Sequence, residues 1–159
     1  MDRPQRILFV CMGNICRSPA AEIIFRKLVC EAGLEEAFEI DSAGTIGYHA
    51  GNPPDSRMTE ALRDRGYEVC GRSRQIVAGD LEQFDRILTM DEDNLADVLS
   101  LSEDPEHRAK VQGIIDHLQQ LQSENIPDPY YGGQKGFERV IELLEDACQG
   151  LLDSLKSER

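Results

Sequence analysis

The sequence has no apolar run long enough to cross a bilayer, and its first residues, MDRPQR, lack the apolar core of a signal peptide. Basic residues are also scarce: 17 Lys and Arg stand against 30 Asp and Glu, which gives a formal net charge of -13. That balance disfavours nucleic acids and anionic membranes as partners, although a single site can still bind an anion through its local field. We therefore expect a cytoplasmic monomer that binds neither nucleic acid nor membrane.

Cysteine is limited to five residues, an odd number. In a chain without an export signal, this count predicts reduced thiols rather than a disulfide framework. The nucleotide-binding patterns G-x4-G-K-S/T and G-x-G-x-x-G are absent, and so is the second Cys-x-x-Cys or nearby His pair that a zinc site would need. With 159 residues, 40% of them hydrophobic and 30% charged, and no repeat or linker, the chain reads as one globular domain spanning residues 1–159.

Short apolar segments alternate with amphipathic ones along the chain. We predict strands at 6–11, 38–41, 86–90 and 110–115, the last of which could equally be helical, and helices at 19–32, 57–65, 91–101 and 137–155. Strands separated by helices pair in parallel, so this order predicts an α/β domain with helices on both faces of the sheet. In such sheets the active groups lie beyond the carboxyl ends of the strands.

The segment CMGNICRS, residues 11–18, directly follows the first predicted strand. Gly13 and Asn14 tolerate unusual backbone angles, and a turn built from them can aim successive N–H groups at one anion. Ser18 suits a helix N-cap and Pro19 the first helical position, so the positive end of a helix dipole should face the same point. The segment therefore predicts a phosphate-binding loop.

Three side chains of this loop supply reactive groups. Cys11 stands at the end of the strand, where the helix N-terminus and a nearby cation favour the thiolate, the nucleophilic form of cysteine. Arg17 carries a planar guanidinium that can grip two oxygens of a tetrahedral oxyanion. The Ser18 hydroxyl could donate to the thiolate and improve it as a leaving group. These residue types together predict phosphoryl transfer through a cysteine.

The motif C-M-G-N-I-C-R-S-P resembles the pattern C-x-G-N-x-C-R-S-P of the low-molecular-weight protein tyrosine phosphatases. The resemblance continues through D-S-A-G-T at 41–45, P-P-D-S-R at 53–57, M-D-E-D-N-L at 90–95 and D-P-Y-Y-G at 128–132. It implies a four-stranded parallel twisted sheet with the phosphate-binding loop after its first strand, and no metal or cofactor. It also implies hydrolysis of phosphotyrosine through a cysteinyl-phosphate, with phosphotyrosine-containing proteins, tyrosine kinases among them, as partners.

The resemblance assigns roles to further residues. Asp128, which lies between two prolines, is the expected general acid that protonates the leaving oxygen and later acts as base toward water. Tyr48, Tyr130 and Tyr131 are expected to wall a deep slot that favours phosphotyrosine, and the last two are also candidate phosphorylation sites. Contacts to phosphate or substrate are expected from the loop residues Met12, Gly13, Asn14, Ile15, Cys16 and Ser18.

Support for the loop is expected from a hydrogen-bond network of Asn14, Ser18 and Ser42. The chain departs from several family members at Gly71, near the position where they carry a histidine, so this network should be closed differently here. Asp91, at the end of a predicted strand, should either orient the loop of the general acid or cap the following helix.

Other interpretations remain open from the sequence alone. Cys16 either fills space or traps an oxidised Cys11 as a reversible disulfide. Arsenate reduction would use the same loop but needs further relay cysteines, of which only Cys70 lies on a predicted loop. Protein-arginine phosphatases of similar sequence carry threonine where this chain has Ile15, and the apolar Ile15 favours an aryl phosphate. A purely phosphate-binding module would need neither a nucleophile nor an acid.

Overall fold

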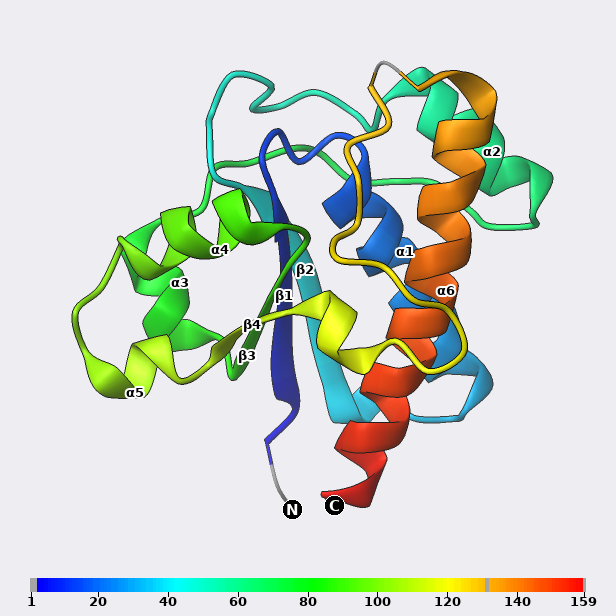
Figure 1. Ribbon diagram of the computed structural model, residues 1–159. Helices are drawn as coiled ribbons and strands as arrows, with labels where there is room; N and C mark the ends of the chain where they lie inside the picture. Colours follow the sequence, from blue (N-terminus) through cyan, green and yellow to red (C-terminus); the bar gives the residue numbers. More distant parts are fainter. Residues whose placement is uncertain (1–2, 131, 159) are drawn as a thin grey trace.

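The computed structural model describes residues 3–130 and 132–158 and shows a sheet with helices on both faces (Figure 1). The sheet has four strands in the order β2-β1-β3-β4, and every neighbouring pair is parallel. The strands are β1 (Gln5–Cys11), β2 (Phe38–Gly44), β3 (Arg86–Thr89) and β4 (Val111–Gly113). The predicted parallel α/β architecture is confirmed.

The helices divide between the two faces of the sheet (Figure 1). One side carries α1 (Arg17–Glu31), α2 (Ser56–Asp64), the short helix η2 (Ile114–His117) and the long α6 (Gly133–Ser157), while η1 (Glu35–Ala37) leads into β2. The other side carries α3 (Ala78–Gln83), α4 (Glu92–Leu99) and α5 (Pro105–Arg108). The loop after β1 lies at one end of the sheet, and β1 begins and α6 ends at the opposite end.

Strand β1 is buried on both faces and contributes side chains to two separate hydrophobic cores. Ile7, Phe9 and Cys11 belong to the larger core under α1 and α6, whereas Leu8 and Val10 belong to the smaller core on the α3 and α4 side. Side chains along a strand alternate between faces, so this apolar run is what a central parallel strand requires. The same alternation points the side chain of Cys11 toward the larger core and the start of α1.

Several elements differ from the sequence prediction. β2 continues through Gly44 because Ser42–Gly44, expected to end it, still pair with Phe9–Cys11. Helix α1 begins at Arg17 with Cys16 in the N-cap position and no side-chain cap, so Ser18 lies inside the first turn and does not cap it. The short helices α3 and α5 were not predicted, and the segment at 110–115 is a brief strand followed by a 3-10 turn.

The long connection between η2 and α6 is held to α6 by one carboxylate. Asp146 accepts hydrogen bonds from the backbone N–H groups of Gln119, Gln120 and Leu121 at 2.9–3.2 Å. One turn further along α6, Gly150 packs so closely on η2 that a Cβ there would overlap the carbonyl of His117. These contacts fix the start of the segment that carries Asp128.

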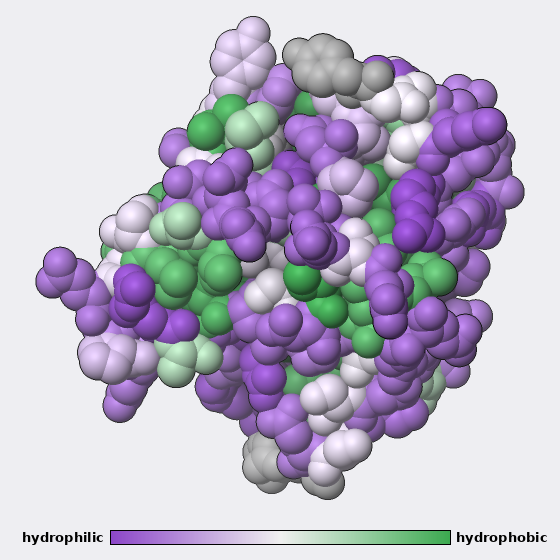
Figure 2. All heavy atoms as spheres, in the orientation of Figure 1, coloured by the Kyte–Doolittle hydropathy of each residue, from purple (hydrophilic) through white to green (hydrophobic). Residues whose placement is uncertain are grey.

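Outside the two cores, the surface is largely hydrophilic, with a local gathering of apolar atoms over the α4 side in the view of Figure 2. This agrees with the strong acidic excess of the sequence. No helix in the described residues combines the length and apolar character needed to span a membrane.

Candidate active site

The loop between β1 and α1 is held from outside through its carbonyl groups. The carbonyls of Cys11, Met12 and Ile15 accept hydrogen bonds from residues 45, 46 and 55 at 2.7–3.0 Å. Within the described part of the chain, the N–H groups of residues 13–16 form no hydrogen bond, so they are available to an anion. Asn14 has a φ of 57°, and a Cβ on Gly44 would stand 2.7 Å from the Met12 carbonyl oxygen. The loop therefore depends on a left-handed residue and a closely packed glycine.

Cys11 lies on the floor of this loop beside the start of α1. Its Sγ is 3.0 Å from the hydroxyl oxygen of Ser18 and 3.4 Å from the Ser18 backbone nitrogen. Both atoms of Ser18 can therefore donate to one sulfur at the positive end of α1. Two donors aimed at one sulfur would stabilise negative charge that develops on it.

The side chain of Asn14 determines which groups donate and which accept in the hydrogen bonds around it. The backbone N–H of Arg74 can only donate, and it lies 3.0 Å from Oδ1 of Asn14. The Asn14 amide nitrogen must therefore donate to the hydroxyl oxygens of Ser18 at 2.8 Å and Ser42 at 3.0 Å. The predicted contact of Asn14, Ser18 and Ser42 is present, and Arg74 is a member that the sequence did not indicate.

Because both serine hydroxyls accept a hydrogen bond from Asn14, each must donate its own proton elsewhere. Ser42 donates to the carboxylate of Glu22 at 2.7 Å. Ser18 can donate to Cys11 at 3.0 Å or to the Ala43 carbonyl at 3.4 Å, and the shorter contact favours the sulfur. The network thus ends on the sulfur of Cys11 at one side and on Glu22 at the other.

Gly71 takes no part in these bonds. Its φ is 108°, and no atom lies within 4 Å of the position where a Cβ would stand. Arg74 closes the network instead, and its guanidinium is fixed by Asp41 at 3.1 Å and by Asp80 at 3.0 and 3.2 Å. The network is therefore closed by a backbone donor that an ion-pair cluster anchors, and not through Gly71.

Arg17 is nearly enclosed, with 4% of its side chain exposed. Its Nη1 donates to Asp91 at 2.6 Å and to the Ile126 carbonyl at 3.1 Å, and its Nη2 lies 3.8 Å from Asp128. The other oxygen of Asp91 accepts from the backbone of Asn94 at 2.8 Å and so caps α4. Asp91 therefore caps α4, and its hydrogen bond to Arg17 connects it with the segment that carries Asp128.

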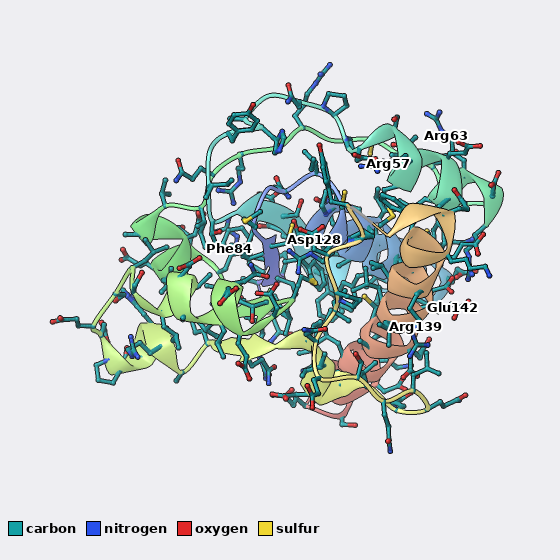
Figure 3. All side chains as sticks on the ribbon, turned by 45° about the horizontal axis from the view of Figure 1, so that its top comes forward. Arg57, Arg63, Phe84, Asp128, Arg139 and Glu142 are labelled. Atoms are coloured by element: carbon teal, nitrogen blue, oxygen red, sulfur yellow. The ribbon has the colours of Figure 1, made fainter. Side chains whose placement is uncertain are left out.

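A pocket of about 330 Å³ opens over the loop. Asp128 lies centrally over this end of the sheet when the molecule is viewed toward it (Figure 3). Tyr48 is 84% exposed and Tyr130 44% exposed, so both stand at the rim rather than inside. Tyr131 lies outside the described residues. The lining residues are Cys11, Met12, Gly13, Ile15, Cys16, Arg17, Ile46, Tyr48, His49, Asp128 and Tyr130.

Ile46 and His49 are lining residues that the sequence did not indicate. The ring of His49 meets that of Tyr48 edge-on, with 4.8 Å between their centroids. Their only sequence signal is proximity to Tyr48 in the loop after β2. Glu22 and Arg74 carried no signal, because they reach the site from a helix and from a distant loop.

The five cysteines are all free thiols in this structure. Cys16 is buried, and burial together with the charge of Asp55 raises the pKa of its thiol. Cys30 and Cys70 are exposed, and Cys148 is buried. Within residues 3–130 and 132–158, no group of three or more His, Cys, Asp or Glu side chains is arranged to hold a metal ion.

Comparison with known proteins assigns the family. The model of the family described as low molecular weight phosphotyrosine protein phosphatase matches residues 6–159. A Synechocystis protein whose name places it among the low molecular weight protein-tyrosine-phosphatases is 52% identical over 153 residues, 96% of this chain and 98% of that protein.

Solved structures agree with that assignment. A protein tyrosine phosphatase from Entamoeba histolytica, with Hepes in its active site, superposes with a TM-score of 0.94 and 44% identity, covering 97% of this chain and 98% of the other. A Drosophila arginine phosphatase superposes with a TM-score of 0.88 and 33% identity, covering 96% and 99% of the two chains. This chain therefore belongs to the low molecular weight phosphotyrosine protein phosphatase family.

Proposed function

We propose that the protein hydrolyses phosphotyrosine in protein substrates through a phosphate transiently bound to Cys11. The observation that carries this proposal is the placement of one sulfur, one guanidinium and one carboxyl around the same pocket. Cys11, Arg17 and Asp128 come from β1, α1 and the segment before α6, and all three line it. A module that only bound phosphate would need neither the sulfur nor the carboxyl.

In the first step the Cys11 thiolate attacks phosphorus, so that an S–P bond forms as the bond to the tyrosine oxygen breaks. The free N–H groups of residues 13–16 and the Arg17 guanidinium face the phosphate oxygens, where charge develops during transfer. Asp128 gives its proton to the departing phenolate. Asp91 holds Arg17 in place with a 2.6 Å hydrogen bond, so the guanidinium is oriented before substrate arrives.

In the second step Asp128, now a carboxylate, takes a proton from water while the water oxygen attacks phosphorus. The S–P bond breaks and inorganic phosphate leaves, which returns Cys11 to the thiolate. The hydroxyl of Ser18, 3.0 Å from the sulfur, stabilises that thiolate as a leaving group. The fixed direction of the Asn14 network keeps the hydroxyl proton available for this contact.

The shape of the pocket supports an aryl phosphate as substrate. Tyr48 and Tyr130 stand at the rim while Cys11 is buried at the floor. A phenyl ring can span that depth, whereas the phosphate of phosphoserine would stop short of the sulfur. We further propose that tyrosine kinases are among the substrates and that the protein acts as a monomer in the cytoplasm.

Phosphoarginine is the second candidate substrate, because one structural relative is an arginine phosphatase. Ile15 lines the pocket of this chain and presents an apolar surface to the substrate. That surface suits an aromatic ring better than a guanidinium, so we rank phosphotyrosine first. Arsenate reduction ranks below both, because the exposed Cys30 and Cys70 line no part of the pocket.

The test compares turnover of phosphotyrosine, phosphoarginine and arsenate by the wild-type protein and by Cys11→Ser. We expect phosphotyrosine hydrolysis that disappears in the serine variant. If phosphate were released faster from phosphoarginine than from phosphotyrosine, phosphoarginine would become the preferred substrate. Reduction of arsenate without phosphatase activity, or full phosphatase activity of Cys11→Ser, would reject the proposal.

A further inference from the structure

We propose that Arg57 is a positioning residue that holds the general acid over the phosphate-binding loop; this rests on the function proposed above for Asp128. Arg57 is at the start of α2, far from Asp128 in sequence, and is not among the residues that line the pocket. Its Nη1 donates to the carbonyl of Tyr130 at 2.8 Å. The N–H of Tyr130 in turn donates to the carboxyl of Asp128 at 3.1 Å. Two hydrogen bonds therefore connect the guanidinium to the acid.

Arg57 is itself held firmly although 43% of its side chain is exposed. Its guanidinium lies 4.9 Å from the ring centroids of both Tyr130 and Phe137, so it is stacked between the acid segment and the first turns of α6. Figure 3 shows Arg57 where α2 approaches the start of α6. Because Phe137 is completely buried, this contact anchors the guanidinium to the core.

Asp55 completes the arrangement and connects it to the phosphate-binding loop. Its carboxylate pairs with Arg57 at 3.2 and 3.3 Å, and its backbone N–H donates to the Ile15 carbonyl at 2.7 Å. Burial alone would raise the pKa of Asp55, but hydrogen bonds from Arg57 outweigh it and hold the pKa below the ordinary value. Asp55 is therefore an anion that binds Arg57, and the pair touches both loops of the site.

The consequence concerns the proton-transfer step. Between η2 and α6, the described residues of the segment that carries Asp128 form no regular secondary structure. Before the acid, Ile126 is bonded to Met90 and Arg17, and the carboxyl of Asp128 itself lies 3.8 Å from Nη2 of Arg17. The bond from Arg57 fixes the segment two residues after the acid. With both sides held, the carboxyl keeps a defined distance from the leaving oxygen, on which general acid catalysis depends.

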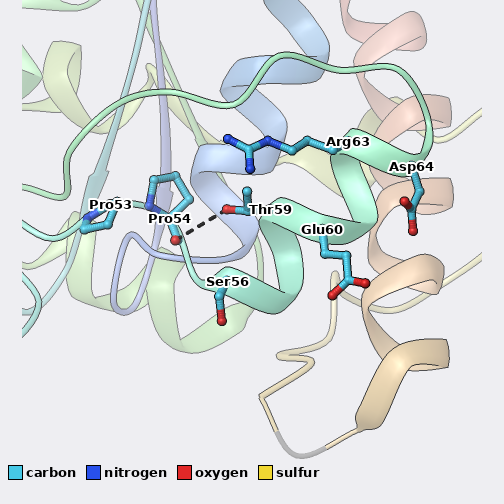
Figure 4. A pocket seen from close by; sticks show the side chains of 7 residues that line it. All are labelled: Pro53, Pro54, Ser56, Thr59, Glu60, Arg63 and Asp64. Atoms are coloured by element: carbon cyan, nitrogen blue, oxygen red, sulfur yellow. Dashed lines mark hydrogen bonds between the residues drawn. The ribbon is translucent and has the colours of Figure 1, made fainter.

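The experiment replaces Arg57 with methionine, which keeps an apolar stem but donates nothing, and with lysine, which keeps charge but lacks the planar fork. Arg63→Met is the matched control, because Arg63 extends from the same helix into a separate surface pocket beside Pro54 and Thr59 (Figure 4). Thermal unfolding checks that each variant folds. If Arg57→Met does not fold, Arg57→Lys carries the comparison.

The readout is kcat/KM for phenyl phosphate and for para-nitrophenyl phosphate, whose better leaving group needs less help from an acid. We expect Arg57→Met to lose about tenfold for phenyl phosphate, a fraction of the usual general-acid contribution, and little for the nitrophenyl substrate. Arg57→Lys should lie between wild type and Arg57→Met, and Arg63→Met should match wild type. Equal losses on both substrates, or none, would overturn the inference.

A double-variant comparison separates positioning from a general weakening of the site. If Arg57 acts through the acid, Arg57→Met should cost almost nothing further in an Asp128→Asn background. Additive losses would reject the positioning role while leaving the proposed reaction intact. Full activity of Cys11→Ser would instead reject the reaction itself, so the two failures can be told apart.

Discussion

Replacing Asn14 tests whether one buried side chain sets both the shape of the phosphate-binding loop and the hydrogen bond from Ser18 to the sulfur of Cys11. Asn14 is 2% exposed, adopts a φ of 57° and makes hydrogen bonds of 2.8–3.0 Å to Ser18, Ser42 and Arg74. At about 1 kcal/mol for each bond, Asn14→Gly should lower the free energy of unfolding by about 3 kcal/mol.

Asn14→Ala should be worse than Asn14→Gly, which is unusual for a helix-proximal position. A left-handed backbone costs alanine about 1–2 kcal/mol, which exceeds the 0.5–1 kcal/mol that glycine loses through the extra freedom of the unfolded chain. The alanine variant should therefore be roughly 1 kcal/mol less stable than the glycine variant. Urea unfolding followed by far-ultraviolet circular dichroism measures this, since the chain has no tryptophan.

Activity of the same variants tests the chemical half of the reasoning. Without the amide, the hydroxyl of Ser18 is free to turn from the sulfur of Cys11. Because a hydrogen bond to a charged group contributes about 1.5–3 kcal/mol, kcat should fall by roughly ten- to a hundredfold in both variants. Ser42→Ala is the control: it removes one bond of Asn14 but no contact to the sulfur. Losses below about 0.5 kcal/mol in stability, or an alanine variant more stable than the glycine variant, would refute the reasoning.

Three further predictions follow from packing, burial and titration. Gly150→Ala should cost about 3 kcal/mol of stability because its Cβ would overlap the His117 carbonyl, whereas Gly79→Ala, with open space around it, should be neutral or stabilising; thermal unfolding compares them. Iodoacetamide at neutral pH should label the exposed Cys30 and Cys70 but not Cys16, whose burial raises the pKa of its thiol; labelling of native Cys16 seen by mass spectrometry would contradict this. Burial lowers the pKa of His117 below its ordinary 6.5, so the unfolded chain binds the proton first and stability should fall as pH drops below about 6.5. His117→Gln should remove that part of the pH dependence of urea unfolding, and an unchanged dependence would contradict it.

The alternation of strands and helices was sufficient to predict the architecture, because each central strand is a continuous apolar run and each long helix has an apolar face. The short helices α3 and α5 were not predicted, because six and four residues are too few to show a helical period. The sequence Asp104-Pro105 did hold a signal for α5, with Asp104 as N-cap and Pro105 in the first turn. A predicted boundary was wrong where strand pairing continued through a turn-like sequence, as at Ser42–Gly44 of β2.

The sequence also predicted those residues of the site that lie close together in the chain, and missed those that come from distant segments. The loop residues lie together in sequence, so their motif could reveal them, and the resemblance added Asp128 and the tyrosines. Glu22 and Arg74 were not predictable, because an arginine or glutamate has the same appearance in sequence whether it binds water or the site. Arg57 stood in the motif P-P-D-S-R at 53–57, but the motif did not indicate its role. Their roles depend on pairings across 20 to 73 positions, such as those of Glu22 with Ser42 and Arg57 with Tyr130, which only the folded chain reveals.

The role of Cys16 stays a prediction. If it traps an oxidised Cys11 as a disulfide, the raised pKa of its thiol should make the trapping step faster as pH rises. Peroxide treatment of wild type and Cys16→Ser, followed by thiol, compares the recovered activity. Equal recovery of both proteins would favour a space-filling role.

The most direct test of the proposed chemistry is to trap the intermediate. Rapid acid quenching during turnover of phosphotyrosine, followed by peptide mass spectrometry, should find a phosphoryl group on the peptide that holds Cys11. Asp128→Asn should raise the trapped fraction if the loss of the base slows hydrolysis of the intermediate more than the loss of the acid slows its formation. Turnover with no phosphoryl group on Cys11, or with the group on another residue, would contradict the proposed mechanism.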